Sequence, residues 1–315
     1  MLAFDPARPL IGQLETGLDA IVESGLSAVR RASEDFMNRV PVMPVLDHGF
    51  VRLVDFMGGD LSVVRNARVS HDAAWRAGKD AGSDERLIRY LQQHGHNTPF
   101  EAVQFTFEVM APIFVLRQWM RHRTKSFNEL SARYREMKPV FFMPDPATIG
   151  TQSKVNKQAR DMASMSEDEI NERVVDVDAV SKCHTIGYAT YKRLLQGGWP
   201  RELARTVLPL ATYSHMFVTV DLHNLFRFLS ERVAWDAQYE IRLYAQALLL
   251  FAGLIAPVSV EAWRDHHFRW EPTGNIAWAA DGVGVKQHWR QPATGKTEWR
   301  DIEPHPHSII EKTSR

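Results

Sequence analysis

The sequence predicts a fold of mixed α/β or α+β class. Three segments alternate apolar and polar residues as half-buried strands do, namely GFVRLVDFM, VQFTFEV and YSHMFVTVDL. Other segments repeat apolar residues at helical spacing. The two kinds of segment are interspersed along the chain, which is typical of a mixed class.

The first half of the chain begins with a predicted helix over 11–39. GFVRLVDFMGG then predicts a strand that ends at the turn signal Gly58-Gly59. Two helices follow, over 60–70 with Asp60 as its N-cap and over 83–95 with Ser83 as its N-cap and Gly95 at its end. The last two elements of this half are a strand over 103–109 and a buried helix over 111–120.

The second half starts with a polar, weakly periodic segment over 144–172, for which we expect a loop with partial order. The remaining predicted helices span about 173–196 (ended by Gly197-Gly198), 199–209, 223–233 and 236–254, and a strand is expected at 213–222. The apolar run inside 236–254 is too short to span a bilayer and indicates a buried helix. After Trp270 the composition predicts an appended hairpin.

Composition excludes several functions. The chain of 315 residues has 38 basic and 38 acidic residues, so its formal net charge is zero, and we expect neither a nucleic acid nor a membrane as partner. A single cysteine, Cys183, allows no disulfide framework, and no secretory signal is apparent, so a cytoplasmic location is expected. The histidines lack the companions of known zinc patterns, so no metal site is predicted.

The stretch RHRTKSFNELSARY, over 121–134, is rich in polar and basic residues and allows two interpretations. In an extended segment Glu129, Ser131 and Arg133 share one side, where a guanidinium and a hydroxyl could hold a phosphate. In a helix, Glu129 and Arg133 form an ordinary surface ion pair. The fragment by itself favours the helical interpretation.

The whole string nevertheless resembles the RHR-then-seven-residues-then-Ser motif of flavin-dependent thymidylate synthases. Further segments are similar to that family in the same order: GHNTPFE (95–101), APIFVLRQWMRHR (111–123), ARTVLPL (204–210) and FLSERVAWDAQYEI (228–241). The resemblance covers about residues 50 to 255. It implies a catalytic domain over 43–264, a helical extension over 1–42 and a C-terminal extension of unknown role over 265–315.

By this resemblance the expected fold is a sheet flanked by long helices in a homotetramer, with active sites where chains meet. The implied reaction converts dUMP to dTMP. Methylenetetrahydrofolate is the carbon donor, and NADPH is the reductant through FAD. These small molecules are the expected partners. No thiol in the chain has an activating motif around it, which agrees with a route that needs no cysteine nucleophile.

The resemblance also assigns residues to the two ligands. Arg232 is the expected catalytic residue, which holds the uracil edge and stabilises negative charge on the ring. The residues implied for dUMP are Gln118, Arg121, Glu129, Leu130, Ser131, Ala132, Arg133, Arg205 and Arg232. Those implied for FAD are Ser70, Thr98, Glu101, Arg121, His122, Arg123, Glu129, Asp221, His223 and Arg227.

Three positions depart from the family pattern. Asp236 stands where many relatives have histidine, Arg227 replaces a more usual Asn or His, and Ala102 replaces a frequent His. We hypothesise that Asp236 and Arg227 form a compensating pair, because an aspartate near the FAD phosphates would otherwise repel them. The alternatives are a catalytically impaired flavin- or nucleotide-binding homologue and, less favoured by the zero net charge, an RNA-binding protein.

Overall fold

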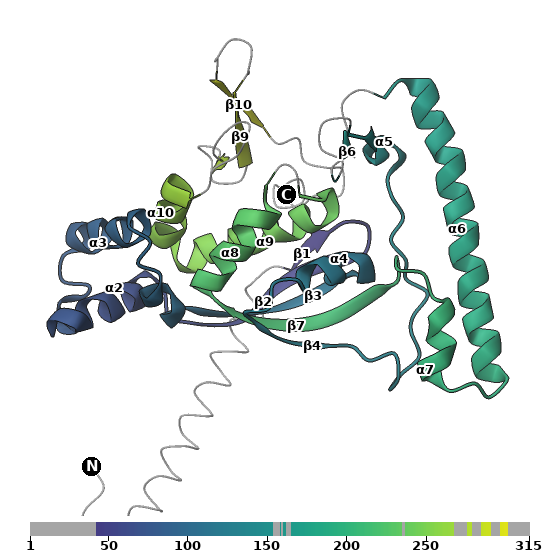
Figure 1. Cartoon of the computed structure of the whole chain (residues 1–315), viewed down its shortest axis with the longest axis horizontal. Helices are drawn as coiled ribbons and strands as arrows, with labels where there is room; N and C mark the ends of the chain where they lie inside the picture. The colour runs from purple at the N-terminus through teal and green to yellow at the C-terminus, as the bar shows by residue number, and fades with distance from the viewer. Residues whose placement is uncertain are drawn as a thin grey trace, which may run out of the picture. The chain divides into compact units, whose positions relative to one another are not determined.

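An antiparallel sheet of five strands forms the centre of the protein (Figure 1). The computed structural model describes residues 42–153, 158, 160–161, 165–234 and 237–267, together with strands at 276–278, 285–290 and 297–301. The central sheet has the order β1-β2-β3-β7-β4, from strands Met43–Val45, Gly49–Met57, Gln104–Pro112, Tyr213–Asp221 and Ser126–Glu129. Since every neighbouring pair is antiparallel, the fold is of the α+β kind.

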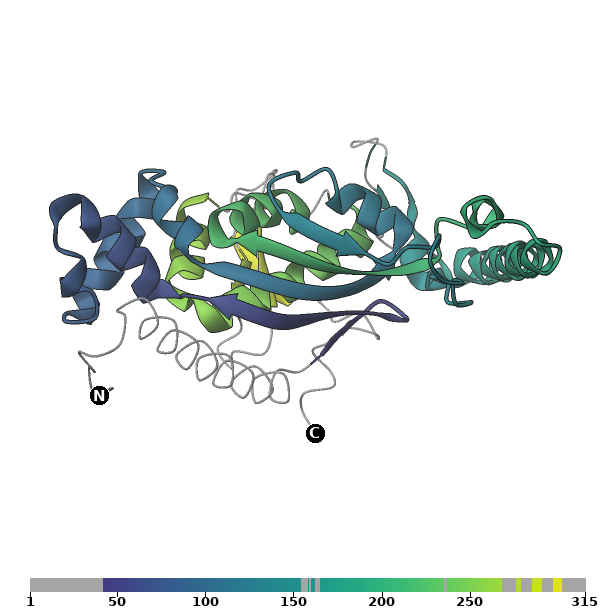
Figure 2. The ribbon, with the colours of Figure 1, turned by 90° about the horizontal axis from the view of Figure 1, so that it is seen from below.

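One face of this sheet is covered by three helices, α4 (Ile113–Trp119), α8 (Leu222–Arg232) and α9 (Tyr239–Ile255) (Figures 1 and 2). The alternation in β7 shows the cause, because Met216, Val218 and Val220 are buried while Phe217 and Thr219 are exposed. The helix-covered face therefore contains the apolar core. The run predicted to be a buried helix is α9, and none of the helices in the described part of the chain is long and apolar enough to cross a membrane.

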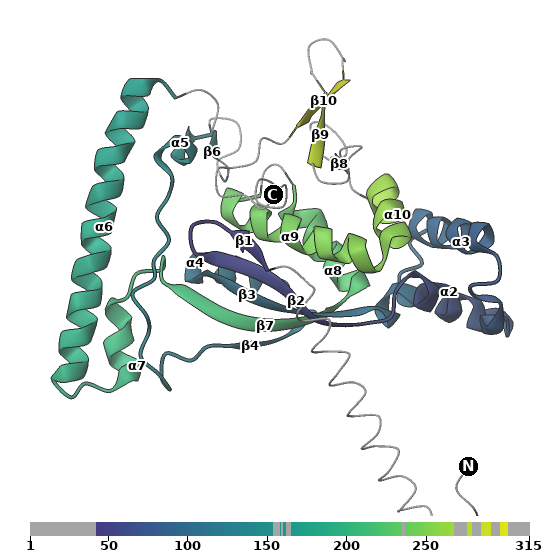
Figure 3. The same cartoon turned by 180° about the vertical axis from the view of Figure 1, so that it is seen from behind.

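The remaining helices lie mainly beyond the two ends of the sheet (Figure 3). Those at one end are α2 (Asp60–Arg68), α3 (Ala81–Gln93) and α10 (Pro257–His267), and those at the other are α6 (Glu167–Gln196) and α7 (Arg201–Ala204). Short elements connect them: η1 (Val69–His71), η2 (Ala74–Arg76), η3 (Thr98–Ala102), α5 (Pro146–Ile149), β5 (Thr151–Gln152), β6 (Arg160–Asp161) and η4 (Arg205–Val207).

The predicted helix caps are wrong in two places. Asp60 is the first residue of α2, and its carboxylate accepts hydrogen bonds from the backbone amides of Val258 and Ser259 in α10. It therefore caps a distant helix, and α10 itself was not predicted from the sequence. The helix α3 is capped by Asp80, whose side chain accepts the amide of Ser83, three residues after the true cap.

The start of the long helix α6 was also placed too late. It begins at Glu167 and not at 173, because Ser166 and Glu169 form a capping box in which each side chain accepts the other residue's amide. The expected loop over 144–172 consequently ends earlier and contains α5, β5 and β6. Cys183 lies on α6 and is exposed.

The other predicted elements are confirmed with shifted boundaries. The helix predicted over 199–209 is the short α7 followed by η4. The predicted hairpin after Trp270 has a third strand: β8 (Ile276–Trp278), β9 (Val285–Arg290) and β10 (Thr297–Asp301) pair in the order β10-β9-β8. The helix predicted over 11–39 lies outside the described residues.

Candidate active site

The first group of predicted site residues surrounds the loop between α4 and β4. This loop carries His122, and α8 packs against it, with the His122 and Phe228 rings 4.8 Å apart. Arg232, in the last turn of α8, donates a hydrogen bond from Nε to Nε2 of His122 at 2.9 Å. The fold thus joins the RHR motif to the expected catalytic arginine, although 110 residues separate them.

This hydrogen bond requires a neutral imidazole with its proton on Nδ1. Burial, reinforced by Arg232, Lys125 and Arg227, lowers the pKa of His122 to about 4. The neutral ring holds Nε of Arg232 and leaves the two terminal nitrogens of the guanidinium for other partners. Among the described residues, the carboxylate near them is Glu231, at 3.6 Å and with a largely exposed side chain.

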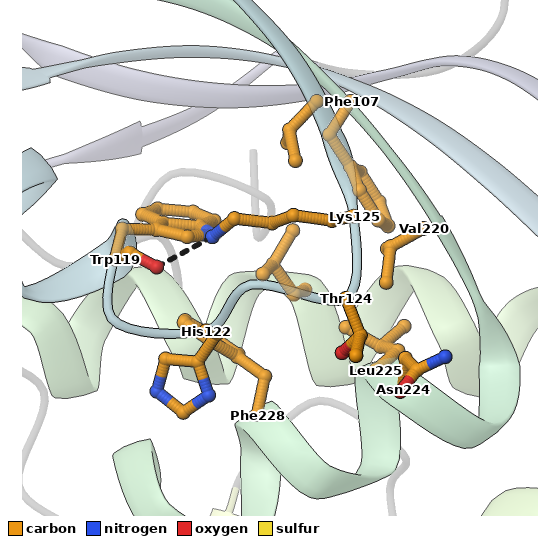
Figure 4. A pocket seen from close by; sticks show the side chains of 11 residues that line it. Phe107, Trp119, His122, Thr124, Lys125, Val220, Asn224, Leu225 and Phe228 are labelled. Carbon is orange, nitrogen blue, oxygen red and sulfur yellow. Dashed lines mark hydrogen bonds between the residues drawn. The ribbon is translucent and has the colours of Figure 1, made fainter.

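An apolar pocket lies beside this contact (Figure 4). Its wall includes Phe107 and Val220 from the sheet, Trp119 from α4 and Phe228 from α8. The ring centroids of Trp119 and Phe228 are 5.0 Å apart, so the two aromatic residues hold α4 and α8 together. The polar residues in its lining are His122, Thr124, Lys125 and Asn224.

A second group lies at the far end of β4, where the strand leads into a turn beside α7. Arg133 pairs with the Glu202 carboxylate at 3.3 Å, and Arg205 donates to the backbone carbonyl of the same residue at 3.3 Å. Two arginines 72 positions apart in the sequence therefore meet at Glu202. Leu130 and Ala132 pack against the apolar cluster of Met137, Tyr191 and Ala204, which fixes the turn.

The chain is extended at Glu129, which belongs to β4, but Ser131 and Arg133 lie in the turn that follows the strand. Glu129 ends β4, and its carboxylate accepts from the Ser214 hydroxyl at 2.6 Å, whereas Arg133 lies in the turn and pairs with Glu202. Ser131 accepts the Arg133 amide at 3.3 Å. The predicted joint site of all three side chains is thus divided within this chain.

A third group lies where β3 begins and α8 starts. Thr98 and Glu101 belong to η3 and are exposed, and Ser70 belongs to η1, which directly follows α2. Asp221 caps α8 by accepting the amide of Asn224 at 2.8 Å. His223 and Arg227 lie on the side of α8 that faces away from its buried residues, as their four-residue spacing predicts.

The predicted site residues thus form three groups in one chain, of which the first and the third share α8. Arg121 and Arg123 flank His122 and are exposed, and Gln118 is hydrogen-bonded to Gln238, which in turn donates to the buried Glu240 at 2.8 Å. The proposed partner of Arg227, Asp236, lies outside the described residues.

Three residues at these groups were not identified from the sequence, namely Lys125, Glu202 and Gln238. For Lys125 a signal existed, because it lies inside the basic stretch 121–134 that carries the RHR motif. No comparable signal marks Glu202 or Gln238, whose partners are distant in the sequence.

Comparisons with known proteins find relatives over most of the chain. The family described as Thymidylate synthase complementing protein matches residues 52–258. A flavin-dependent thymidylate synthase of Thermus thermophilus is 44% identical over 224 residues, which are 71% of this chain and 78% of the relative. One of Treponema pallidum is 40% identical over 238 residues, which are 76% of this chain and 75% of the relative.

Solved structures give the same result. The UMP/dUMP methylase PolB of Streptomyces cacaoi, bound with 5-Br dUMP, superposes with a TM-score of 0.62 at 37% identity and covers 70% of this chain and 97% of its own. The residues that the family model matches, 52–258, include the RHR loop, the strands β3, β7 and β4 and the helix with Arg232. The chain belongs to the flavin-dependent thymidylate synthase family.

Proposed function

We propose that this protein reductively methylates dUMP to dTMP, with FAD as cofactor, NADPH as reductant and methylenetetrahydrofolate as carbon donor. The family supports the reaction and its cofactors. The observation that carries the assignment to this chain's residues is the hydrogen bond between Arg232 and the neutral His122. It orients the guanidinium while leaving its terminal nitrogens available.

Arg232 acts on the uracil ring in this proposal. Its fixed positive charge stabilises the negative charge that develops when C5 of the base attacks the one-carbon unit. The neutral His122 contributes by holding Nε without adding a repulsive charge beside the guanidinium. When bound, FAD supplies the hydride chemistry of the reduction.

The basic residues around the RHR loop suit the phosphates of FAD. The charges of Lys125 and Arg227 reach His122, and both remain for the phosphates when Arg232 acts on the uracil ring; the neighbouring acid Glu231 is largely exposed. Such an excess of positive charge favours a ligand with several negative charges. We assign Arg133 and Arg205 to the phosphate of dUMP, because both converge on Glu202 and present their donors at the same place.

Tritium release from dUMP labelled at C5 tests the role of Arg232. Wild type releases tritium, and Arg232→Ala is expected to lose release by about a hundredfold or more, the size typical for removal of one charge-stabilising donor. Arg173→Ala is the matched control, because Arg173 forms a surface pair with Asp176 on α6. Equal rates for wild type and Arg232→Ala would remove Arg232 from this role.

Comparison of dUMP with deoxyuridine tests the phosphate assignment. Arg133→Ala and Arg205→Ala are expected to weaken binding of dUMP and to leave binding of deoxyuridine unchanged, because only dUMP carries the phosphate. Equal weakening of both ligands would show that these arginines act on the structure and not on the phosphate.

The distance between the two basic groups supports a homotetramer with shared sites. His122 precedes β4 and Arg133 follows it, and four extended residues span roughly 13 Å. We therefore propose that Arg232 of one chain and Arg133 of another complete one site. At a dUMP concentration too low to saturate Arg133→Ala, mixing this variant with Arg232→Ala under subunit exchange is expected to raise the activity above that of either variant alone. No increase would contradict a shared site.

The alternative is a catalytically impaired homologue that binds flavin and nucleotide. A yellow protein that binds dUMP, releases no tritium and oxidises NADPH at the same rate with and without dUMP would favour this alternative.

A further inference from the structure

Lys125 is half-buried beside the RHR loop. Its Nζ donates to the backbone carbonyl of Trp119 at 2.6 Å and lies 5.4 Å from the Trp119 ring and 5.7 Å from the Phe228 ring (Figure 4). The side chain lines the apolar pocket. The contacts of the amine within the described residues thus include one carbonyl and two aromatic faces.

The charges around Lys125 are unbalanced. The loop contributes His122, and α8 contributes Arg227, Arg232 and the acid Glu231, while the sheet face of the pocket is apolar. Glu231 lies 3.7 Å from His122 and 3.6 Å from Arg232, and within the described ranges no carboxylate forms an ion pair with Lys125. Burial, and then the nearby Arg232, lower the pKa of Lys125 to about 7.

A half-buried amine among cations gains its missing counter-charge when an anion binds. We infer that Lys125 is a further residue of the FAD phosphate site and takes up a proton when the cofactor binds. This inference rests on the proposed function, in which the same basic group holds FAD. The competing interpretation is that Lys125 only fastens the Trp119 carbonyl, in which case its protonation does not change with the ligand.

The two interpretations predict different pH dependence of FAD affinity. If Lys125 is about half protonated in the free protein near pH 7 and fully protonated in the complex, FAD binding must add a proton. The affinity for FAD then falls as the pH rises. Between pH 6 and pH 8 the dissociation constant is then expected to rise roughly tenfold. A purely structural Lys125 predicts no such rise.

Titration calorimetry of the full-length apoprotein with FAD measures the proton directly. At pH 7, in MOPS and in Tris, whose ionisation enthalpies differ, wild type is expected to take up about half a proton per FAD. Lys125→Arg, which stays charged, is expected to bind FAD with no uptake. Lys125→Met, which stays neutral, is expected to bind more weakly at pH 6 and to lose the tenfold dependence.

Lys79→Met is the matched control, because Lys79 also stacks on an aromatic ring, with Nζ 4.3 Å from the Trp75 ring centroid, but lies outside the three site groups. It is expected to keep the proton uptake of wild type. Circular dichroism of every variant establishes that it is folded.

The outcomes separate this inference from the proposed function. Tight FAD binding by wild type without proton uptake overturns the role of Lys125 alone. Unchanged uptake in Lys125→Arg also overturns it, since the proton then goes to another group such as His122. A folded wild-type protein that binds no FAD overturns the proposed function and this inference together.

Discussion

Asp60 joins two helices that are almost 200 residues apart in the sequence. Its Oδ1 accepts hydrogen bonds from the Ser259 amide at 2.9 Å and the Ser259 hydroxyl at 2.6 Å, and its Oδ2 accepts the Val258 amide at 3.0 Å. Ser259 is completely buried. Removal of the carboxylate therefore leaves three donors without their acceptor, of which the two of Ser259 belong to a buried residue and the Val258 amide to a half-buried one.

We expect Asp60→Ala to lower the free energy of unfolding by about 3 kcal/mol. About 1 kcal/mol is the usual loss of an N-cap, and about 2 kcal/mol follows from the buried donors left unsatisfied. For a domain of this size the midpoint temperature falls by roughly 6–12 °C. Asp60→Asn keeps one acceptor oxygen and is expected to lose about half as much.

Urea unfolding of the apoprotein, followed by circular dichroism, measures these changes. Asp178→Ala is the control, because Asp178 pairs with Lys182 on the exposed surface of α6, and a change within about 0.5 kcal/mol is expected. Ser259→Ala completes a double-mutant cycle with Asp60→Ala, and a coupling energy of about 1 kcal/mol is expected. A loss below about 1 kcal/mol for Asp60→Ala, or strict additivity in the cycle, would refute this reasoning.

Three other predictions concern buried polar groups. The pKa of His122 is about 4 in the folded protein and ~6.5 in the unfolded chain, so the unfolded chain binds more protons between these values. The free energy of unfolding is therefore expected to fall by about 2 kcal/mol between pH 7 and pH 4, after allowance for partial exposure of the ring. In urea unfolding, the midpoint of His122→Asn should fall less over this pH range than the midpoint of wild type. Glu240 is buried and pairs with Arg160 at 2.8 Å. Glu240→Gln should therefore lower the free energy of unfolding by about 2 kcal/mol in wild type and by less in the Arg160→Met variant. Equal losses in the two proteins would argue against the pair. The Tyr191 hydroxyl accepts the amide of Met137 at 3.1 Å, so Tyr191→Phe should cost about 1–2 kcal/mol in the same assay, and an unchanged midpoint would show that the amide finds another partner.

The type and order of most elements could be predicted from the sequence, because periodicity and caps depend on residues a few positions apart. The strands β2, β3 and β7 follow from alternation, and α9 from its apolar run. The true start of α6 at Glu167 could also have been predicted, since Ser166 and Glu169 have the spacing of a capping box. The short strands β1 and β4 were missed because three or four residues carry too little pattern.

The sequence by itself determined the family through its RHR motif and the segments around it, and with the family the identity of most candidate site residues. Only the tertiary structure decided which of these residues meet. The packing of α7 and α8 beside the sheet brings His122 to Arg232, joins Arg133 and Arg205 at Glu202, and leaves Lys125 half-buried. Asp60 shows the physical reason most directly: an aspartate before an apolar run has the local pattern of a cap in any protein, but the amide groups it accepts are set by the packing of α2 against α10.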